Sequence, residues 1–286
     1  MRQMAERPSA PPNESLKELR DRIDQAMAQI PTAPGVEVTE TRWGDVGGLR
    51  CRPVDVTDPP TLVYFHGGGF RMGSSIAYQA FTSHLALELS AEVVVPDYRL
   101  APEHPYPAAL HDVVEVWNTL LADGHSPDRI VIAGDSAGGG LAASLVLTTT
   151  NRAVPAGLVC LSPWVDLQMS SDTYRLNRDS DRLFSRESAD AAARLYLGTV
   201  DPADPLVSPV VGDWTSAPPA LILVGGAEVL LGDSLDLART MAVQGVDVEL
   251  RVFAEMPHIW MTNHPAFPEA IRAIEAVAGF FGRVTS

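Results

Sequence analysis

Apolar runs and longer mixed segments alternate along this chain of 286 residues. Eight runs have the length of β-strands, and from the third onward they are almost continuously apolar, which is typical of strands buried on both faces of a sheet. The eight runs span residues 36–43, 48–54, 61–66, 91–98, 129–134, 156–162, 220–226 and 246–253. Five segments with helical character lie between or after them, at residues 77–90, 108–124, 137–150, 233–245 and 268–283. Alternating strands and helices predict the α/β class: a mostly parallel sheet with helices on both faces.

Two segments interrupt this alternation and are not needed to complete the sheet. The first is a helix-like stretch at residues 14–30, and the second is a polar segment at about residues 167–205. Because open α/β sheets bind ligands at the carboxyl ends of their strands, we expect both segments to form a small helical cap there. The expected organisation is cap helices in residues 1–40 and a main α/β domain in residues 41–286, which contains the second segment as a cap insertion.

Charge and cysteine content limit the partners and the compartment. The chain has 21 Lys and Arg residues against 36 Asp and Glu residues, a formal net charge of −15. Nucleic acids and anionic membranes bind clustered basic side chains, so we expect neither as a partner. No apolar stretch reaches the roughly 18 residues of a membrane-spanning helix. Cys51 and Cys160 stand alone within strand-like runs, which favours reduced core thiols in a cytoplasmic protein and offers no metal site.

The stretch GDSAGGG, residues 134–140, follows an apolar strand and opens a helix rich in Ala and Leu. It matches the G-x-S-x-G nucleophile elbow, in which a serine occupies a strained turn from strand to helix. The residues two before and two after this serine must be tiny, and Gly134 and Gly138 hold those positions around Ser136. The alternative is a glycine-rich turn in which Ser136 only caps the helix, and the strand-turn-helix context argues against it.

A serine nucleophile needs a base, and in folds that use this elbow the acid and the histidine follow the serine in the chain. Two histidines qualify, His258 in MPHIW and His264 in TNHPAF. His258 comes just after the last strand, where a loop can return it to the end of the sheet, so we expect it to be the base. His264 precedes a proline at the start of the final helix and is expected to be a surface or capping residue.

Two carboxylates follow the seventh strand, Glu228 and Asp233, and both are within reach of that loop. Asp233 stands directly before a helix, and a role as helix cap or first-turn acid explains it. Glu228 lies close to the strand end and has no such role. Because an acid that orients an imidazole must be fixed by a strand end, the sequence favours Glu228 over Asp233.

Three adjacent glycines follow the third strand in the stretch YFHGGGF, residues 64–70. Acyl transfer by serine creates an oxyanion that N–H donors must meet, and side chains would keep a backbone from coming so close. We expect Gly68 and Gly69 to supply donors from this loop, and Ala137, next to the serine, to supply a third. His66 is expected to pin the loop by hydrogen bonding.

The stretches HGGGF, DYRLAPEHPYPAALHD, GDSAGGG and MPHIW resemble motifs of the hormone-sensitive-lipase-like branch of the α/β-hydrolases, and DPLVSP, residues 204–209, is also similar. The resemblance begins at about Thr61. It implies an α/β-hydrolase fold with an eight-stranded sheet, a cap made from the amino-terminal helices and the insertion, and carboxylesterase activity without a cofactor. Many members carry Asp before Pro-Leu where this chain has Glu228 before Val-Leu, so the choice between Glu228 and Asp233 as the acid stays open.

The expected function is hydrolysis of short- to medium-chain esters by the serine, histidine and glutamate named above. Phe70, Met72 and Trp260 are candidates for the substrate pocket, although such side chains are more often plain core. An amidase, formamidase or lactonase would use the same residues, because the elbow does not report the leaving group. A non-catalytic small-molecule receptor on the same fold is the alternative from another class, but receptors that resemble this branch have lost the histidine that this chain keeps. A small-molecule ester is the expected partner, and a homodimer stays open.

Overall fold

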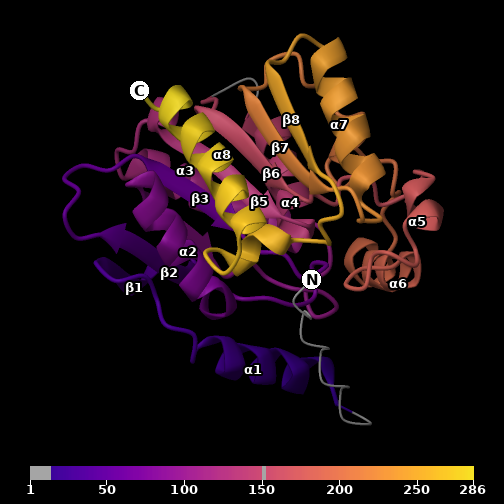
Figure 1. The fold of residues 1–286 in the computed structure, drawn as a ribbon, viewed down its shortest axis with the longest axis horizontal. Coiled ribbons are helices and arrows are strands. Elements are labelled where there is room, and N and C mark those ends of the chain that lie inside the picture. The colour runs from indigo at the N-terminus through magenta and orange to yellow at the C-terminus, as the bar shows by residue number, and fades with distance from the viewer. Residues whose placement is uncertain (1–13, 150–152) are drawn as a thin grey trace.

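The computed structural model describes residues 14–149 and 153–286. Eight strands form a single sheet in the order β1-β2-β4-β3-β5-β6-β7-β8 (Figure 1). Their bounds are β1 Val36–Trp43, β2 Val46–Pro53, β3 Thr61–Phe65, β4 Glu92–Pro96, β5 Ile130–Asp135, β6 Gly157–Leu161, β7 Ala220–Gly225 and β8 Val248–Phe253. Each predicted apolar run contains one of these strands or overlaps it, which confirms the expected eight-stranded α/β architecture.

Most neighbouring strands of the sheet are parallel. β1 pairs antiparallel with β2, and β2 with β4, whereas the five remaining pairs are parallel. In β5, Gly134 lies opposite Phe65 of β3, and Asp135 lies opposite Leu161 of β6. Since parallel strands end at the same edge of a sheet, the loops that follow β3, β5, β7 and β8 meet there. These loops carry the candidate residues identified from the sequence.

Helices cover both faces of the sheet. α2 and α8 pack on one face, and α3, α4 and α7 pack on the other. Their bounds are α2 Ser75–Leu89, α3 Ala108–Ala122, α4 Ala137–Thr149, α7 Leu231–Val243 and α8 Pro268–Val284. Side chains of β3 alternate between the two cores: Leu62 and Tyr64 lie in the core with α2 and α8, whereas Val63 and Phe65 lie in the core with α3 and α4. The last residue of the helix expected at 137–150 lies outside the described residues.

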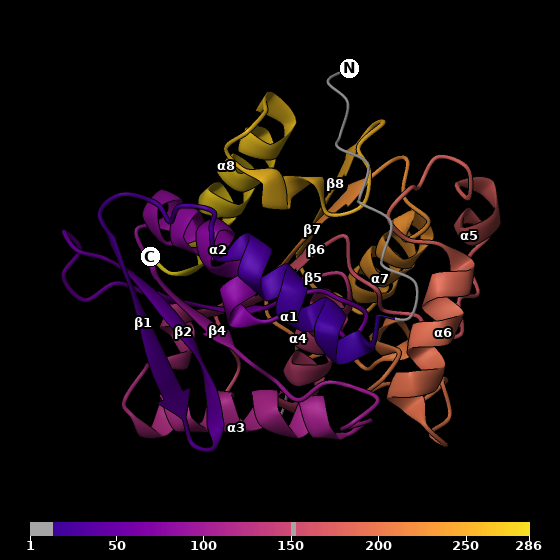
Figure 2. The ribbon, with the colours of Figure 1, turned by 90° about the horizontal axis from the view of Figure 1, so that it is seen from below.

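Three further helices lie outside these layers, namely α1 Leu16–Met27, α5 Thr173–Leu176 and α6 Arg186–Leu197. In Figure 2, α1 crosses in front of the sheet, and α5 and α6 lie together at one side. None of the residues of α1 is buried. Arg20 ties α1 to the rest of the molecule by donating to the backbone oxygens of Arg71 and Ala101, at 2.8 Å each. Residues 1–13 of the expected amino-terminal cap lie outside the described residues.

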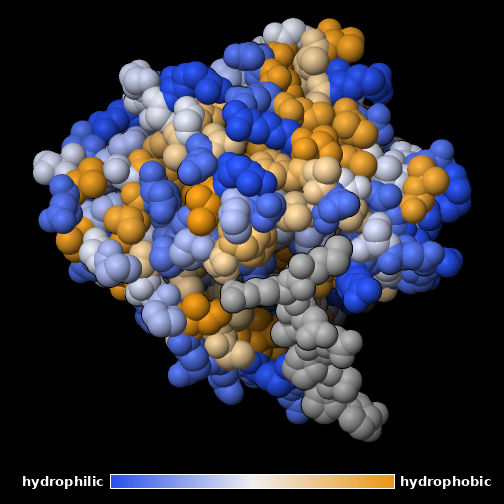
Figure 3. All heavy atoms as spheres, in the orientation of Figure 1, coloured by the Kyte–Doolittle hydropathy of each residue, from blue (hydrophilic) through white to orange (hydrophobic). Residues whose placement is uncertain are grey.

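One face of the molecule carries an apolar area over β8 and α7, with polar side chains beside it (Figure 3). Val252 of β8 and Val243 of α7 are 47% and 79% exposed. β8 ends the sheet and has only β7 as a strand neighbour, so one edge of β8 is unpaired within the described residues. Within the same ranges, no helix is both long and apolar enough to cross a lipid bilayer.

Candidate active site

Ser136 stands at the sharp turn between β5 and α4. Its φ of 53° lies in the left-handed region, which non-glycine residues adopt at a cost in backbone strain. The turn is crowded: a Cβ on Gly134 would lie 2.3 Å from the backbone oxygen of Gly138, and a Cβ on Gly138 would lie 2.0 Å from the backbone oxygen of Phe65. Only glycine therefore fits the positions two before and two after the serine, and the turn presents Ser136 at the carboxyl end of β5.

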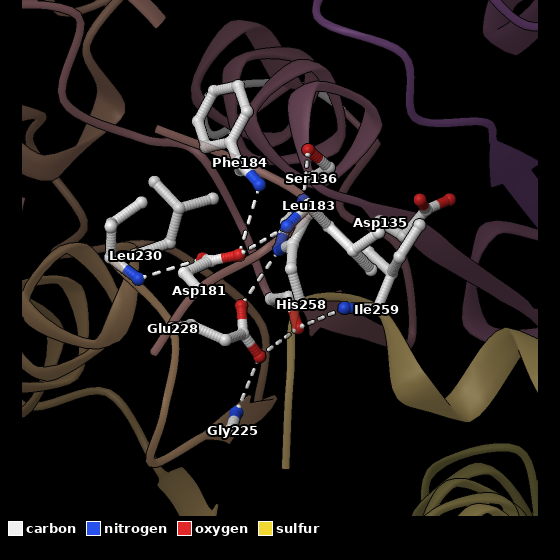
Figure 4. Close-up of polar contacts among 12 residues, drawn as sticks. Asp135, Ser136, Asp181, Leu183, Phe184, Gly225, Glu228, Leu230, His258 and Ile259 are labelled. Carbon is white, nitrogen blue, oxygen red and sulfur yellow. Dashed lines mark hydrogen bonds and ion pairs between the residues drawn. The ribbon is translucent and has the colours of Figure 1, made fainter. Parts of the chain in front are cut away.

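Three candidate residues from different loops form one hydrogen-bonded chain (Figure 4). The Oγ atom of Ser136 lies 2.9 Å from Nε2 of His258, and Nδ1 of His258 lies 2.8 Å from Oε2 of Glu228. The other carboxylate oxygen of Glu228 accepts hydrogen bonds from the Ser162 hydroxyl at 2.7 Å and the Gly225 N–H at 2.6 Å. All three residues of the chain are buried. The structure thus brings together the nucleophile, base and acid that the sequence favours.

The surroundings of His258 control its proton affinity. Burial disfavours the imidazolium, but the hydrogen bond and the charge of Glu228, with further contributions from Asp181 and Asp135, raise the pKa of His258 above its usual value. Burial raises the pKa of Glu228, and the donors on its two oxygens counteract that rise. An imidazole in this setting can take up the proton of Ser136 and hold it beside a carboxylate.

The two residues weighed against these candidates have other contacts. Asp233 lies in the first turn of α7, but its Oδ2 accepts hydrogen bonds from the N–H groups of Val165 and Asp166, at 3.2 and 3.1 Å. His264 is buried, with Nε2 3.7 Å from a carboxylate oxygen of Glu88. His264 was expected to be a surface or capping residue. Its backbone N–H does cap the turn Trp260–Asn263, donating to the Met261 oxygen at 3.0 Å, but its side chain is not at the surface, because it lies inward against His84 of α2.

The glycine-rich loop after β3 presents unused backbone donors. Gly68 and Gly69 have φ of 121° and 63°, and a Cβ on Gly68 would lie 2.1 Å from the backbone oxygen of Met72. Among the described residues, the N–H groups of Gly68, Gly69 and Ala137 have no acceptor. His66 lies in the loop with Nδ1 2.9 Å from the backbone oxygen of Gly67. Such free, fixed donors suit an anion that forms during a reaction.

Similarity to known proteins agrees with this geometry. Residues 62–262 match the family model of the alpha/beta hydrolase fold. The chain belongs to the α/β-hydrolase family. It is 37% identical to an acetyl-hydrolase of Streptomyces hygroscopicus, over 93% of this chain and 88% of that protein, and 34% identical to an esterase of Acinetobacter venetianus, over 92% and 87%. A crystal structure of an esterase from the bacterial hormone-sensitive lipase family matches with a TM-score of 0.93 and 33% identity, over 97% of this chain and 94% of that one.

Within this hormone-sensitive-lipase-like hydrolase, the three candidate pocket residues have different surroundings. Phe70 is buried and stacks on Tyr196 of α6, with ring centroids 3.8 Å apart, and its ring edge approaches α4 at Gly140. Met72 is half-buried. Trp260 packs in the core on the α2 and α8 side of the sheet, so the structure does not bring it together with Phe70.

Several residues around the hydrolase site were not anticipated from the sequence. Ser162 donates to Glu228, and Asp181 accepts from the backbone beside Glu228. Trp164 and Phe184 pack edge to face against each other. Trp164 also lies beside Phe70, and Phe184 stacks on His258. The only signal for the aromatic pair is residue type, and nothing in the sequence pattern distinguishes Ser162 or Asp181 from other polar loop residues.

Proposed function

We propose that this α/β-hydrolase cleaves small carboxylic esters with Ser136 as nucleophile, His258 as general base and Glu228 as the acid that orients the imidazole. The chain is a carboxylic ester hydrolase of the serine-hydrolase class. The observation that carries the residue roles is the unbroken chain of hydrogen bonds from Ser136 through His258 to Glu228, with distances of 2.9 and 2.8 Å.

In the first half-reaction the Ser136 oxygen attacks the ester carbonyl carbon while Nε2 of His258 takes the hydroxyl proton. The carbonyl oxygen becomes an oxyanion, and the free N–H groups of Gly68, Gly69 and Ala137 are positioned to bind it. The C–O bond to the alcohol then breaks, and His258 gives its proton to the leaving alcohol.

In the second half-reaction a water molecule replaces the alcohol. His258 takes a proton from the water as the water attacks the acyl-serine, and the collapse of the second tetrahedral intermediate releases the carboxylic acid. Glu228 stabilises the imidazolium in both halves without being protonated. Every group used here is a side chain or backbone amide of the chain, so we propose that no cofactor takes part.

We further propose that α1 and the segment with α5 and α6 form the cap over this site, in line with the expected division into residues 1–40 and an insertion at about 167–205. The stacking of Phe70 on Tyr196 supports this role, because it joins the oxyanion loop to α6. Phe70 and Met72 would then line the space for the substrate. The packing of Trp260 on the opposite side of the sheet supports a core role for that residue.

The test of the proposed function is the variant Ser136→Ala, assayed with p-nitrophenyl acetate and butyrate. We expect loss of turnover with an unchanged melting temperature, because alanine lacks the nucleophilic oxygen and fills the same turn. Wild-type turnover in the purified variant would overturn the assignment of the nucleophile. Faster cleavage of a matched p-nitroanilide amide than of the ester by the wild type would make the protein an amidase instead.

For location and assembly we propose a cytoplasmic protein that acts without nucleic acid or membrane. The two cysteines are free and buried, and burial raises the pKa of the Cys51 thiol to about 11, which suits stable thiols in a reducing compartment. The net charge of −15 disfavours polyanionic partners. The unpaired edge of β8 is a site where a second copy could pair in a homodimer.

A further inference from the structure

The loop that carries Glu228 joins β7 to α7 and is held mainly by side chains from the insertion before it in the sequence. Buried backbone groups outside helices and strands need such partners. We call the four side chains that supply them, Thr173, Asn177, Ser180 and Asp181, the clasp. Asn177 Nδ2 donates to the backbone oxygen of Glu228 at 2.6 Å and of Gly226 at 3.2 Å, Ser180 donates to that of Ala227 at 2.9 Å, and Thr173 donates to that of Val229 at 2.7 Å. The clasp thus contacts every residue of the loop from 226 to 229.

Asp181 also connects the clasp to His258, the middle residue of the hydrogen-bonded chain. One carboxylate oxygen accepts the N–H of Val229 at 2.9 Å, directly after Glu228. The other accepts the N–H groups of Leu183 and Phe184 at 3.0 Å each (Figure 4). These bonds hold the backbone at Phe184, whose ring stacks against the ring of His258 with centroids 5.5 Å apart and an interplanar angle of 22°. A single buried carboxylate therefore connects the loop of the acid with the aromatic ring that covers the base.

We propose that Asp181, assisted by Asn177, is a positioning residue for catalysis, which sets the place of Glu228 through its loop and of His258 through Phe184. The proposal rests on the proposed function, since it assigns a role toward the acid and the base of that mechanism. A displacement of reacting groups by about 1 Å can cost about 10²-fold in rate. The hydrogen bonds of the clasp to the backbone before and after Glu228 oppose such a displacement.

Asp181 also acts through its charge. Three carboxylates influence His258, namely Glu228 from the β7–α7 loop, Asp181 from the insertion and Asp135 from the end of β5, and all three favour the imidazolium. The first shares a hydrogen bond with the imidazole, and the other two act through space. Removing the charge of Asp181 should therefore lower the pKa of His258, an effect that packing alone would not produce.

The deciding variant is Asp181→Asn. An amide has one accepting oxygen and one NH₂ group, so it cannot accept from Val229 on one side and from Leu183 and Phe184 on the other. We expect kcat for p-nitrophenyl butyrate to fall by about 10- to 100-fold, the usual cost of losing an outer orienting partner, with KM nearly unchanged. The acid limb of the kcat/KM profile should move to lower pH. The matched control is Asp179→Asn, in the same segment but with a side chain that is 89% exposed and forms an ion pair with the adjacent Arg178; it should keep the wild-type kcat and pH profile.

A neutral variant separates orientation from charge. Asn177→Ala removes the donor to the Glu228 carbonyl and changes no charge, so kcat should fall while the acid limb stays in place. Wild-type kcat and an unmoved acid limb in Asp181→Asn would overturn the proposal. If Asp181→Asn does not fold, Asn177→Ala decides, and an unchanged kcat overturns it. Ser136→Ala is assayed alongside: turnover in that variant rejects the proposed function, whereas an inactive Ser136→Ala with a silent Asp181→Asn rejects only the positioning role.

Discussion

The two carboxylate oxygens of Glu228 have separate partners, and this separation makes the residue hard to replace. One oxygen faces Nδ1 of His258, and the other accepts from Ser162 and Gly225. All three partners can donate, so an acceptor is needed on both sides. A carboxylate supplies two acceptors, whereas an amide supplies one acceptor and one donor. Whichever way an amide turns, one side of position 228 is mismatched.

Glu228→Gln should lower kcat by about 10²- to 10⁴-fold, because the misplaced amide turns the imidazole away from Ser136 or leaves the wrong tautomer. Steady-state kinetics on p-nitrophenyl butyrate measure the effect. The control is Asp233→Asn, which should keep kcat, since one amide oxygen can still accept from Val165 and Asp166. The opposite result, a crippled Asp233→Asn and a nearly silent Glu228→Gln, would exchange the two roles.

Protonation of Asp233 is expected to make the free energy of unfolding depend on pH. Burial, with a further contribution from the charge of Asp166, raises the pKa of Asp233 well above its unfolded value. The folded state then binds a proton more tightly than the unfolded state, so this carboxyl lowers the free energy of unfolding as the pH rises from about 4 through its folded pKa. Asp233→Asn removes this dependence. Thermal melts between pH 4 and pH 9 should show the stability of the variant, relative to the wild type, increasing with pH; a constant difference would contradict the raised pKa.

At the scale of elements, apolar periodicity was sufficient to predict the strands and the helices that pack on them. The run at 36–43 matches β1 residue for residue, and the helix predicted at 108–124 contains α3. The antiparallel pairing of β1 and β2 and the burial of His264 depend on contacts between distant segments, which no local pattern contains. The same reason explains the clasp: Asp181 lies 48 positions from Val229, and only the folded chain brings them together.

Alanine substitution of two helical glycines, Gly138 at the start of α4 and Gly279 in α8, is predicted to have opposite effects. A Cβ added to Gly138 would lie 2.0 Å from the Phe65 oxygen and 2.4 Å from the His66 oxygen, whereas a Cβ added to Gly279 in α8 has nothing within 4 Å. Gly138→Ala should therefore displace the end of β3 and the glycine-rich loop that follows it, with a lower melting temperature and a loss of about 10²-fold or more in kcat. Gly279→Ala should keep kcat and gain about 0.5–1 kcal/mol of stability from helix propensity. Normal turnover by Gly138→Ala would show that α4 can move away from β3 without harm.

At the scale of the whole molecule, the fold buries the proposed nucleophile and base. Ser136 is 4% exposed and His258 is 5% exposed. Phe184 of the insertion stacks on His258, Trp164 packs against Phe184, and Phe70 packs against Trp164. The outer surface of the insertion is rich in charged side chains, several of them in exposed ion pairs. A buried candidate site beside a segment with a charged outer surface suits dissolved small esters better than a lipid surface.

The expected consequence is a preference for short acyl chains. In a series of p-nitrophenyl esters, kcat/KM should be highest for acyl groups of about two to eight carbons, in keeping with ligand sites of roughly 300–1,000 Å³. An emulsified long-chain triglyceride, assayed in parallel by titration of released acid, should be a poor substrate. Fastest turnover on the emulsion, or on acyl chains of palmitate length, would contradict this preference and show that the proposed cap opens widely enough for a true lipase.

The clasp limits how the insertion can be redesigned. Exchanging the segment between β6 and β7 is an obvious way to engineer a new substrate range. This segment contains Phe184, which stacks on His258, and Tyr196, which stacks on Phe70. That exchange also removes the side chains of the clasp that bind the loop at residues 226–229. A chimera with an ideally shaped pocket would then turn over slowly on every substrate. Grafts that retain residues 173–181 and vary the chain from 185 onward keep the acid loop intact, so selectivity can change there without a general loss of rate.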